Sequence, residues 1–289
     1  MRGREKFLTL AAVIVLGFFA WVGGSSAEDA PPPVAPAQAI EEDRSAAASF
    51  EAAIKKLDPM VRAKKGRPEE GMLTLRLVET YAKLTGVRFR LAHAPGASEA
   101  DRAQLESALD STQRWSSLYL QKFPRGEGVA RAVYLRAKAR GDAKSEDASI
   151  ADYRYLIDHF EPGPDHVSAH LTLHELLVKK QDFRTAVAYL KKLGATPRDG
   201  HYSLVLDHFA FAHYSLNEIP ASIRYLEAEL ALFPEAAELT ATALSERDKI
   251  FGNLALYYFT GVEKKMPGFS WQSYLAQVLK LKPGLALNK

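Results

Sequence analysis

The chain of 289 residues contains no cysteine. This absence excludes thiolate metal ligands, cysteine nucleophiles and disulfide bonds, and also the lipid-modified cysteine that anchors a bacterial lipoprotein. Runs of β-branched residues bounded by turn residues, the usual signal of strands, are almost absent as well. Hydrophobic residues make up 47% of the chain and charged residues 25%, which is typical of a globular protein. The sequence therefore predicts a globular, all-α fold.

A large excess of positive charge is missing too. The formal net charge is +3 at pH 7, and +2 of it lies in residues 1–27, where Arg2, Arg4 and Lys6 outnumber Glu5. The rest of the chain is close to neutral, whereas a surface that binds nucleic acid is strongly basic. We therefore predict no nucleic-acid partner.

The short motifs that mark common enzyme classes are not found. The sequence has no GxSxG elbow, no glycine-rich phosphate loop and no complete HExxH zinc motif, because the second histidine is missing after His174 and Glu175. The acidic pair Glu69 and Glu70 is explained by the first turn of a helix, where negative charge is favourable. We predict a protein that is not an enzyme and that has no cofactor.

The N-terminus has the pattern of an export signal. Residues 1–27 begin with basic residues, continue with an apolar run at 7–22 and end with small residues up to Ala27. This predicts a secretory signal peptide cleaved after Ala27, and hence a periplasmic or exported protein. The alternative is a single uncleaved membrane anchor, and contact with a membrane is expected only in that case. Residues 28–43, rich in Pro and Ala, are predicted to be a linker.

The remaining residues, 44–289, are predicted to form one domain of helical repeats. A first helix is expected from Arg44 to Pro59 and a second from Met72 to Leu91. Further along, five apolar helical segments each end at a proline, which stops a helix because it has no amide donor. These prolines are 38, 35, 37 and 49 residues apart, at Pro124, Pro162, Pro197, Pro234 and Pro283. The spacing indicates four to six helical hairpins, each buried only against its neighbours.

The clearest hairpins are residues 166–197 and 201–234. Each has two amphipathic helices joined by a short polar turn, at Gln181 in the first hairpin and at Asn217 in the second. Aligning the turns places Ala186 on Ser222, and a small residue there allows two helices to approach closely.

These hairpins resemble the tetratricopeptide repeat, whose unit is about 34 residues with a small residue early in its second helix. The two units lack the tryptophan of the family pattern, His174 stands where the family has a small residue, and Ser222 replaces alanine. Residues 105–235 resemble the cell-envelope branch of this superfamily in bacteria. The resemblance implies a right-handed α-solenoid whose first helices line a concave groove.

The groove implied by this resemblance combines aromatic side chains with both signs of charge. Such a surface suits an extended peptide or a helix of a partner protein in the envelope, and we expect a non-enzymatic binding scaffold. The alternative is a solvated groove without a single ligand. The sequence leaves the oligomeric state open. The expected groove residues are Arg131, Tyr134, Lys138, Leu171, Glu175, Lys179, Asp207, Phe211 and Tyr214.

Three histidines form a row at helical spacing. His166, His170 and His174 recur every four residues, so that neighbouring imidazoles on one helix face could share a divalent metal. This gives the alternative function of a periplasmic metal or small-ligand binding protein. The competing interpretation is that His174, at an inward repeat position, is a packed core residue.

The densest aromatic run lies near the C-terminus, in residues 251–275. It fits a capping hairpin that closes the end of the solenoid. It also fits a docking or dimerisation surface, because aromatic residues are enriched at binding hot spots. The exposed area of these side chains distinguishes the two.

Overall fold

The computed structural model describes residues 36–233 and 240–281. The predicted signal peptide at 1–27, with its apolar run, lies outside these residues. Within them there is no β-strand, so the all-α prediction is confirmed for this part of the chain. The helices are α2 (Pro36–Ala63), α3 (Glu69–His93), α4 (Glu99–Lys122), α5 (Val129–Asp142), α6 (Glu146–His159), α7 (His166–Lys179), α8 (Phe183–Lys192), α9 (Tyr202–Ser215), α10 (Ile219–Leu230), α11 (Ala241–Glu263) and α12 (Trp271–Leu281).

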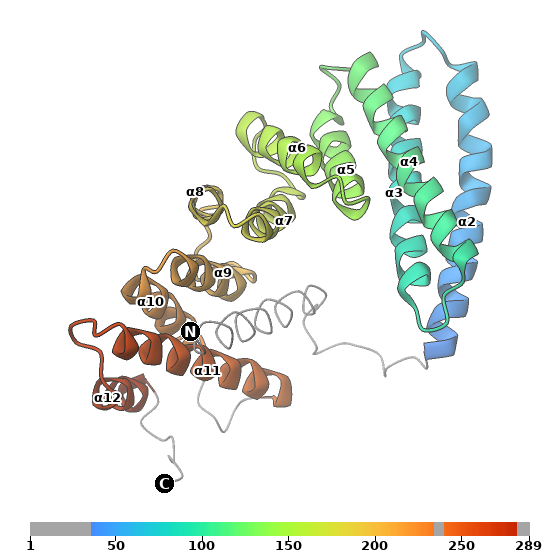
Figure 1. The fold of residues 1–289 in the computed structure, drawn as a ribbon. Coiled ribbons are helices and arrows are strands. Elements are labelled where there is room, and N and C mark those ends of the chain that lie inside the picture. Colours follow the sequence, from blue (N-terminus) through green and yellow to red (C-terminus); the bar gives the residue numbers. More distant parts are fainter. Residues whose placement is uncertain (1–35, 234–239, 282–289) are drawn as a thin grey trace, which may run out of the picture.

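The helices follow one another in space as they do in sequence. Three long helices, α2, α3 and α4, lie side by side, and the later helices continue from them as an arc (Figure 1). Helices α5, α7, α9 and α11 lie on the inner side of this arc, and α6, α8, α10 and α12 on the outer side. Each helix packs mainly against its neighbours in the sequence. The fold is therefore an α-solenoid-like array.

Four hairpins end their first helix in the same way. Lys144, Gln181, Asn217 and Lys265 all adopt a positive φ, between 52° and 63°. The residue after each of them donates its amide to the carbonyl five residues earlier, at 2.8 to 3.0 Å. This left-handed residue closes the helix and reverses the chain. The turns expected at Gln181 and Asn217 are confirmed, and the same geometry marks two further hairpins.

The second helices of these hairpins approach the first through small residues. Aligned on the turns, Ser149, Ala186 and Ser222 are equivalent, and all three are fully buried. The hydroxyl of Ser149 donates to the carbonyl of Ala137 on the facing helix at 2.8 Å. The close approach predicted from Ala186 and Ser222 is thus present, and Ser149 extends it to α5 and α6.

The core runs along the array as a series of clusters of buried residues. One joins α3 through α8, another joins α8 and α9, and a third joins α9 through α11. Phe123 and Phe160, which follow α4 and α6 directly, pack against the first cluster. Pro124, Pro162 and Pro197 each follow the end of a helix, as predicted, whereas Pro234 and Pro283 lie outside the described residues.

The first helix differs from its prediction at both ends. It begins at Pro36, so residues 36–43 are helical and do not belong to a linker. An ion pair between Asp43 and Arg90 of α3, at 2.6 Å, fixes this first part. The helix also continues through Pro59 to Ala63, because packing of Leu57 and Val61 against α3 outweighs the one amide donor that the proline lacks.

None of the helices in residues 36–233 and 240–281 is long and apolar enough to cross a membrane.

Candidate functional site

The nine residues predicted to line a groove all lie on the inner helices α5, α7 and α9 (Figure 1). Aligned on the turns, Tyr134, Leu171 and Asp207 share one position of the hairpin. The structure therefore brings these residues to one side of the arc, but it gives them different roles.

Arg131 and Tyr134 connect neighbouring hairpins. The Arg131 guanidinium forms ion pairs with Asp165 at 2.5 Å, just before α7, and with Glu79 of α3 at 3.4 Å. The same guanidinium lies 5.7 Å from the centre of the Tyr134 ring. Tyr134 in turn meets the ring of Tyr153 on α6 edge to face. These groups hold α5 against the helices before and after it.

The predicted groove residues Leu171, Phe211 and Tyr214 are partly buried between helices. Tyr214 stacks on Tyr257 of α11, with ring centres 4.1 Å apart. Phe211 lies edge to face against Phe183 at the start of α8, and Leu171 packs on the core shared by α8 and α9. The rings that were expected to contact a partner thus pack against Tyr257 and Phe183 of other helices.

The other three residues predicted on α5 and α7 are charged. Lys138 and Lys179 are exposed, and Lys179 forms an ion pair with Glu146 of α6. Glu175 is partly buried and has no ion pair with any described residue. Burial alone raises its pKa to about 7. This face therefore carries separated positive groups around a carboxyl group that is poorly solvated.

Asp207 lies apart from the other eight. It is buried between α9 and α11, where its carboxylate meets the ammonium of Lys249 at 3.4 Å. Burial raises its pKa, and Lys249 opposes this shift. Asp207 belongs to a small pocket of its own.

The three histidines of α7 are all buried, and they serve different neighbours. His166 accepts from the amide of Gly163 and donates to the carbonyl of Phe160, each at 3.1 Å. His170 donates to the carbonyl of Tyr189, and the ring of His174 meets that of His208 edge to face at 4.6 Å.

This arrangement of histidines favours the packed-core interpretation. Two of the rings already use ring nitrogens on backbone groups. No group of three or more potential ligands is placed to hold a metal ion in residues 36–233 and 240–281. Burial also lowers the pKa of His174 to about 4, so its ring is neutral at pH 7.

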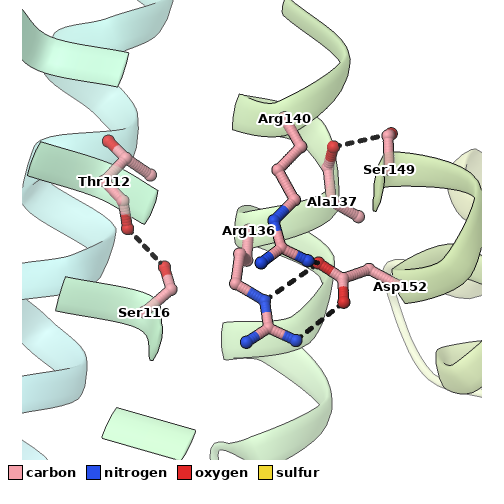
Figure 2. A network of polar contacts seen from close by, with 7 residues as sticks. All are labelled: Thr112, Ser116, Arg136, Ala137, Arg140, Ser149 and Asp152. Atoms are coloured by element: carbon pink, nitrogen blue, oxygen red, sulfur yellow. Dashed lines mark hydrogen bonds and ion pairs between the residues drawn. The ribbon is translucent and has the colours of Figure 1, made fainter. Parts of the chain in front are cut away.

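A buried ionic network between α5 and α6 was not expected from the sequence (Figure 2). Asp152 of α6 is almost fully buried and accepts two hydrogen bonds from Arg136, at 2.7 and 2.9 Å, and one from Arg140 at 2.8 Å. The sequence shows two arginines four residues apart on α5, which indicates a basic helix face. It does not show that Asp152 is their partner, because this depends on how α6 packs against α5.

A wide cleft of about 1040 Å³ lies where the end of α3, the start of α4 and the end of α5 meet. Its walls carry both signs of charge, including His93, Arg102 and Glu106. Asp142, the last residue of α5, also lines it, and burial raises its pKa. No local sequence pattern indicates this cleft, because its walls come from three helices.

The aromatic C-terminal hairpin has two layers. Tyr257 is buried in the core of α9, α10 and α11, as a capping role requires. Trp271, Leu275 and Leu279 are between 42% and 49% exposed on α12, and Phe259 is exposed beside Trp271. The run therefore closes the array and also presents apolar side chains at its surface.

No model of a known protein family matches this chain, and no curated protein sequence is significantly similar to it.

Proposed function

We propose that this protein is a non-enzymatic scaffold of the bacterial cell envelope that binds a peptide or partner protein along α5, α7 and α9. In this proposal the helices form a right-handed solenoid of tetratricopeptide-like repeats. The shared turn geometry of four hairpins supports the repeat character. The secretory pattern of residues 1–27 supports export to the periplasm.

The observation that carries the proposal is the way in which the inner helices are joined. Arg131 links α5 to α3 and to the start of α7, and Tyr214 links α9 to α11. A surface held in this way is formed before a partner arrives, so less conformational entropy is lost on binding. A repeat array without such links would have to order its face at the moment of binding.

The charges on this face suggest how a partner is oriented. Lys138 and Lys179 are exposed on α5 and α7, and Glu175 of α7 occupies the same repeat position as Lys138 when the turns are aligned. An acidic side chain of the partner would meet the lysines, and a donor or cation would meet Glu175. Such contacts fix register and direction more than they add affinity.

The test is capture of crosslinked partners from cell envelopes by the full chain. The working variant combines Lys138→Glu with Lys179→Glu, because the aromatic residues Tyr134, Phe211 and Tyr214 hold the array together and their loss would disturb the fold. The matched control combines Arg184→Glu with Lys191→Glu on the outer helix α8, where both residues are exposed.

We expect one partner to be captured by the parent and by the outer-face control and to be lost with the inner-face variant. Equal capture by both variants, or loss from both, would remove the inner face as the binding surface. The mass of the protein recovered from the envelope tests export separately, because a cleaved chain begins at Glu28 and an anchored one retains residues 1–27.

A further inference from the structure

Two buried carboxyl groups occupy positions that are apolar or aromatic in the two preceding hairpins, α5–α6 and α7–α8. Aligned on the turns, Asp207 corresponds to Leu171 and Tyr134. Glu229 corresponds in the same way to Leu193 and Leu156. Only 7% of Asp207 and 6% of Glu229 is exposed. The fold accepts apolar side chains at both positions, so packing does not require these acids.

The two acids line one pocket between α9, α10 and α11. Its volume is about 210 Å³, and its walls are formed by Ser203, Leu204, Asp207, Glu229, Phe233, Ser245, Glu246, Lys249 and Ile250. Three of these residues are apolar, and the polar ones come from all three helices. This space is large enough for a small charged group with a short carbon chain.

Only one of the two carboxylate oxygens of Glu229 has a hydrogen-bond partner among the described residues of this pocket. Its Oε1 accepts a hydrogen bond from the hydroxyl of Ser203 at 2.8 Å. Its Oε2 is shielded from solvent and accepts no hydrogen bond from any residue that the structure describes. A buried polar atom without a partner costs free energy, and the cost is larger for a charged one. A hydrogen-bond donor of a ligand would therefore contribute most binding free energy at Oε2.

The pocket contains more acid than base. Of the described residues that line it, Asp207, Glu229 and Glu246 are acidic and only Lys249 is basic, with a side chain that is about half exposed. Burial raises the pKa of Glu229 to about 8, and repulsion from Asp207 contributes to the shift. A bound positive charge would offset both burial and this repulsion, because it stabilises the ionised carboxylate of Glu229.

We propose that this pocket binds an organic cation, a primary ammonium or guanidinium group, on the carboxylates of Glu229 and Asp207. Both groups carry several N–H donors, which match a carboxylate oxygen that lacks a donor. Leu204, Phe233 and Ile250 accept the attached methylene groups. Among the described residues no group of three ligands is placed for a metal ion, so an organic cation fits better than a divalent metal. This site is independent of binding along α5, α7 and α9.

The binding is coupled to a proton. With a pKa of about 8, Glu229 is mostly protonated at pH 7, and it must ionise to hold a cation. Affinity should therefore rise about tenfold between pH 6 and pH 7 and level off above pH 8. Asp207, Glu246 and Lys249 surround Glu229, and their charges set how far its pKa falls when the cation binds.

The experiment measures binding of propylguanidinium and propylammonium to the full chain by calorimetry, with propanol as the uncharged probe. The working variant is Glu229→Leu, which restores the residue of the equivalent positions 156 and 193 and therefore preserves packing. The matched control is Glu227→Leu on the same helix, outside the pocket. Circular dichroism of each variant verifies its helix content.

We expect saturable binding of both cations and none of propanol, with affinity at least tenfold weaker in Glu229→Leu and unchanged in Glu227→Leu. Equal binding to parent and Glu229→Leu, or no binding of either cation up to pH 9, would overturn the proposal. N-acetyl-arginine amide and putrescine then distinguish the source of the cation. Tighter binding of the former indicates a basic side chain of a polypeptide, and tighter binding of the latter a free amine.

Discussion

Two hairpins of this array bury acidic residues, and they do so with opposite results. In α5 and α6, Asp152 is surrounded by Arg136 and Arg140, which satisfy both of its oxygens (Figure 2). In α9 and α10, one oxygen of Glu229 has no hydrogen-bond donor among the described residues, and Asp207 forms an ion pair with Lys249. The first arrangement joins two helices. The second costs stability in the isolated protein, and that cost is what a bound cation would remove.

The largest expected effect on stability comes from removing Asp152, the acid whose two oxygens both accept hydrogen bonds. Asp152→Ala should lower the free energy of unfolding by about 3–5 kcal/mol, because it leaves two arginines facing each other without a counterion in a largely buried site. Urea unfolding measures the change. The control is Asp147→Ala, whose carboxylate is exposed and pairs with Lys180 at the surface. Similar losses in the two variants would mean that the Asp152 network is not a special contributor.

Replacing Glu229 should, by contrast, raise the free energy of unfolding. Its pKa is about 8 in the folded state against 4.5 for the ordinary side chain. The folded state thus binds the extra proton, and stability falls as pH rises from about 4.5 to 8. At pH 7, Glu229→Leu should raise the free energy of unfolding by about 2–3 kcal/mol, with a smaller gain at pH 5. The exposed Glu263→Leu on α11 is the control, and a Glu229→Leu variant that is less stable than the parent at both pH values contradicts the prediction.

Acid should weaken the array through the histidines of α7 and α9. Burial lowers the pKa of His174 to about 4, and that of His208 is lowered as well. The unfolded chain then binds more protons, so stability is lost as pH falls below about 6.5. His174 alone should account for about 2 kcal/mol of this loss at pH 5. His174→Ala, which carries the residue of the equivalent positions 137 and 210, should flatten the acid slope of thermal unfolding, whereas the exposed His159→Ala should leave it unchanged.

The smallest expected effect concerns the turn geometry that four hairpins share, here tested in the turn between α7 and α8. Gln181 has a φ of 59°, which glycine adopts without strain. Gln181→Gly should therefore stabilise the protein by about 0.5–1 kcal/mol, measured as the midpoint of urea unfolding. Gln181→Ala keeps the strain and serves as the control. A loss of stability with glycine would indicate that the greater freedom of the unfolded chain outweighs the relief of strain.

Local patterns predicted the helical elements well. The apolar spacing around Leu173 and Leu190 predicted two helices, and the polar residues at Gln181 predicted the turn between them. Proline was less reliable: Pro162 follows the end of a helix, but Pro59 lies inside one. The difference depends on packing against α3, which no local pattern contains.

The candidate sites were predicted less well, because their chemistry depends on neighbours that are distant in sequence. Tyr214 was assigned to a groove, yet it stacks on Tyr257, which lies 43 residues further along the chain. Glu229 was not identified at all. An acidic residue at the position of Leu156 and Leu193 was a signal in the sequence, and the turn alignment would have shown it.

The helical class and the hairpin turns followed from the sequence alone, since each depends on spacing along one or two helices. Which charges are paired depends on the tertiary structure. The ion pairs of Asp152 and Arg131 and the unsatisfied oxygen of Glu229 depend on how neighbouring helices approach each other. Ionic and hydrogen-bonding energies vary over distances of about an ångström, whereas the hydrophobic pattern that forms a helix tolerates much more.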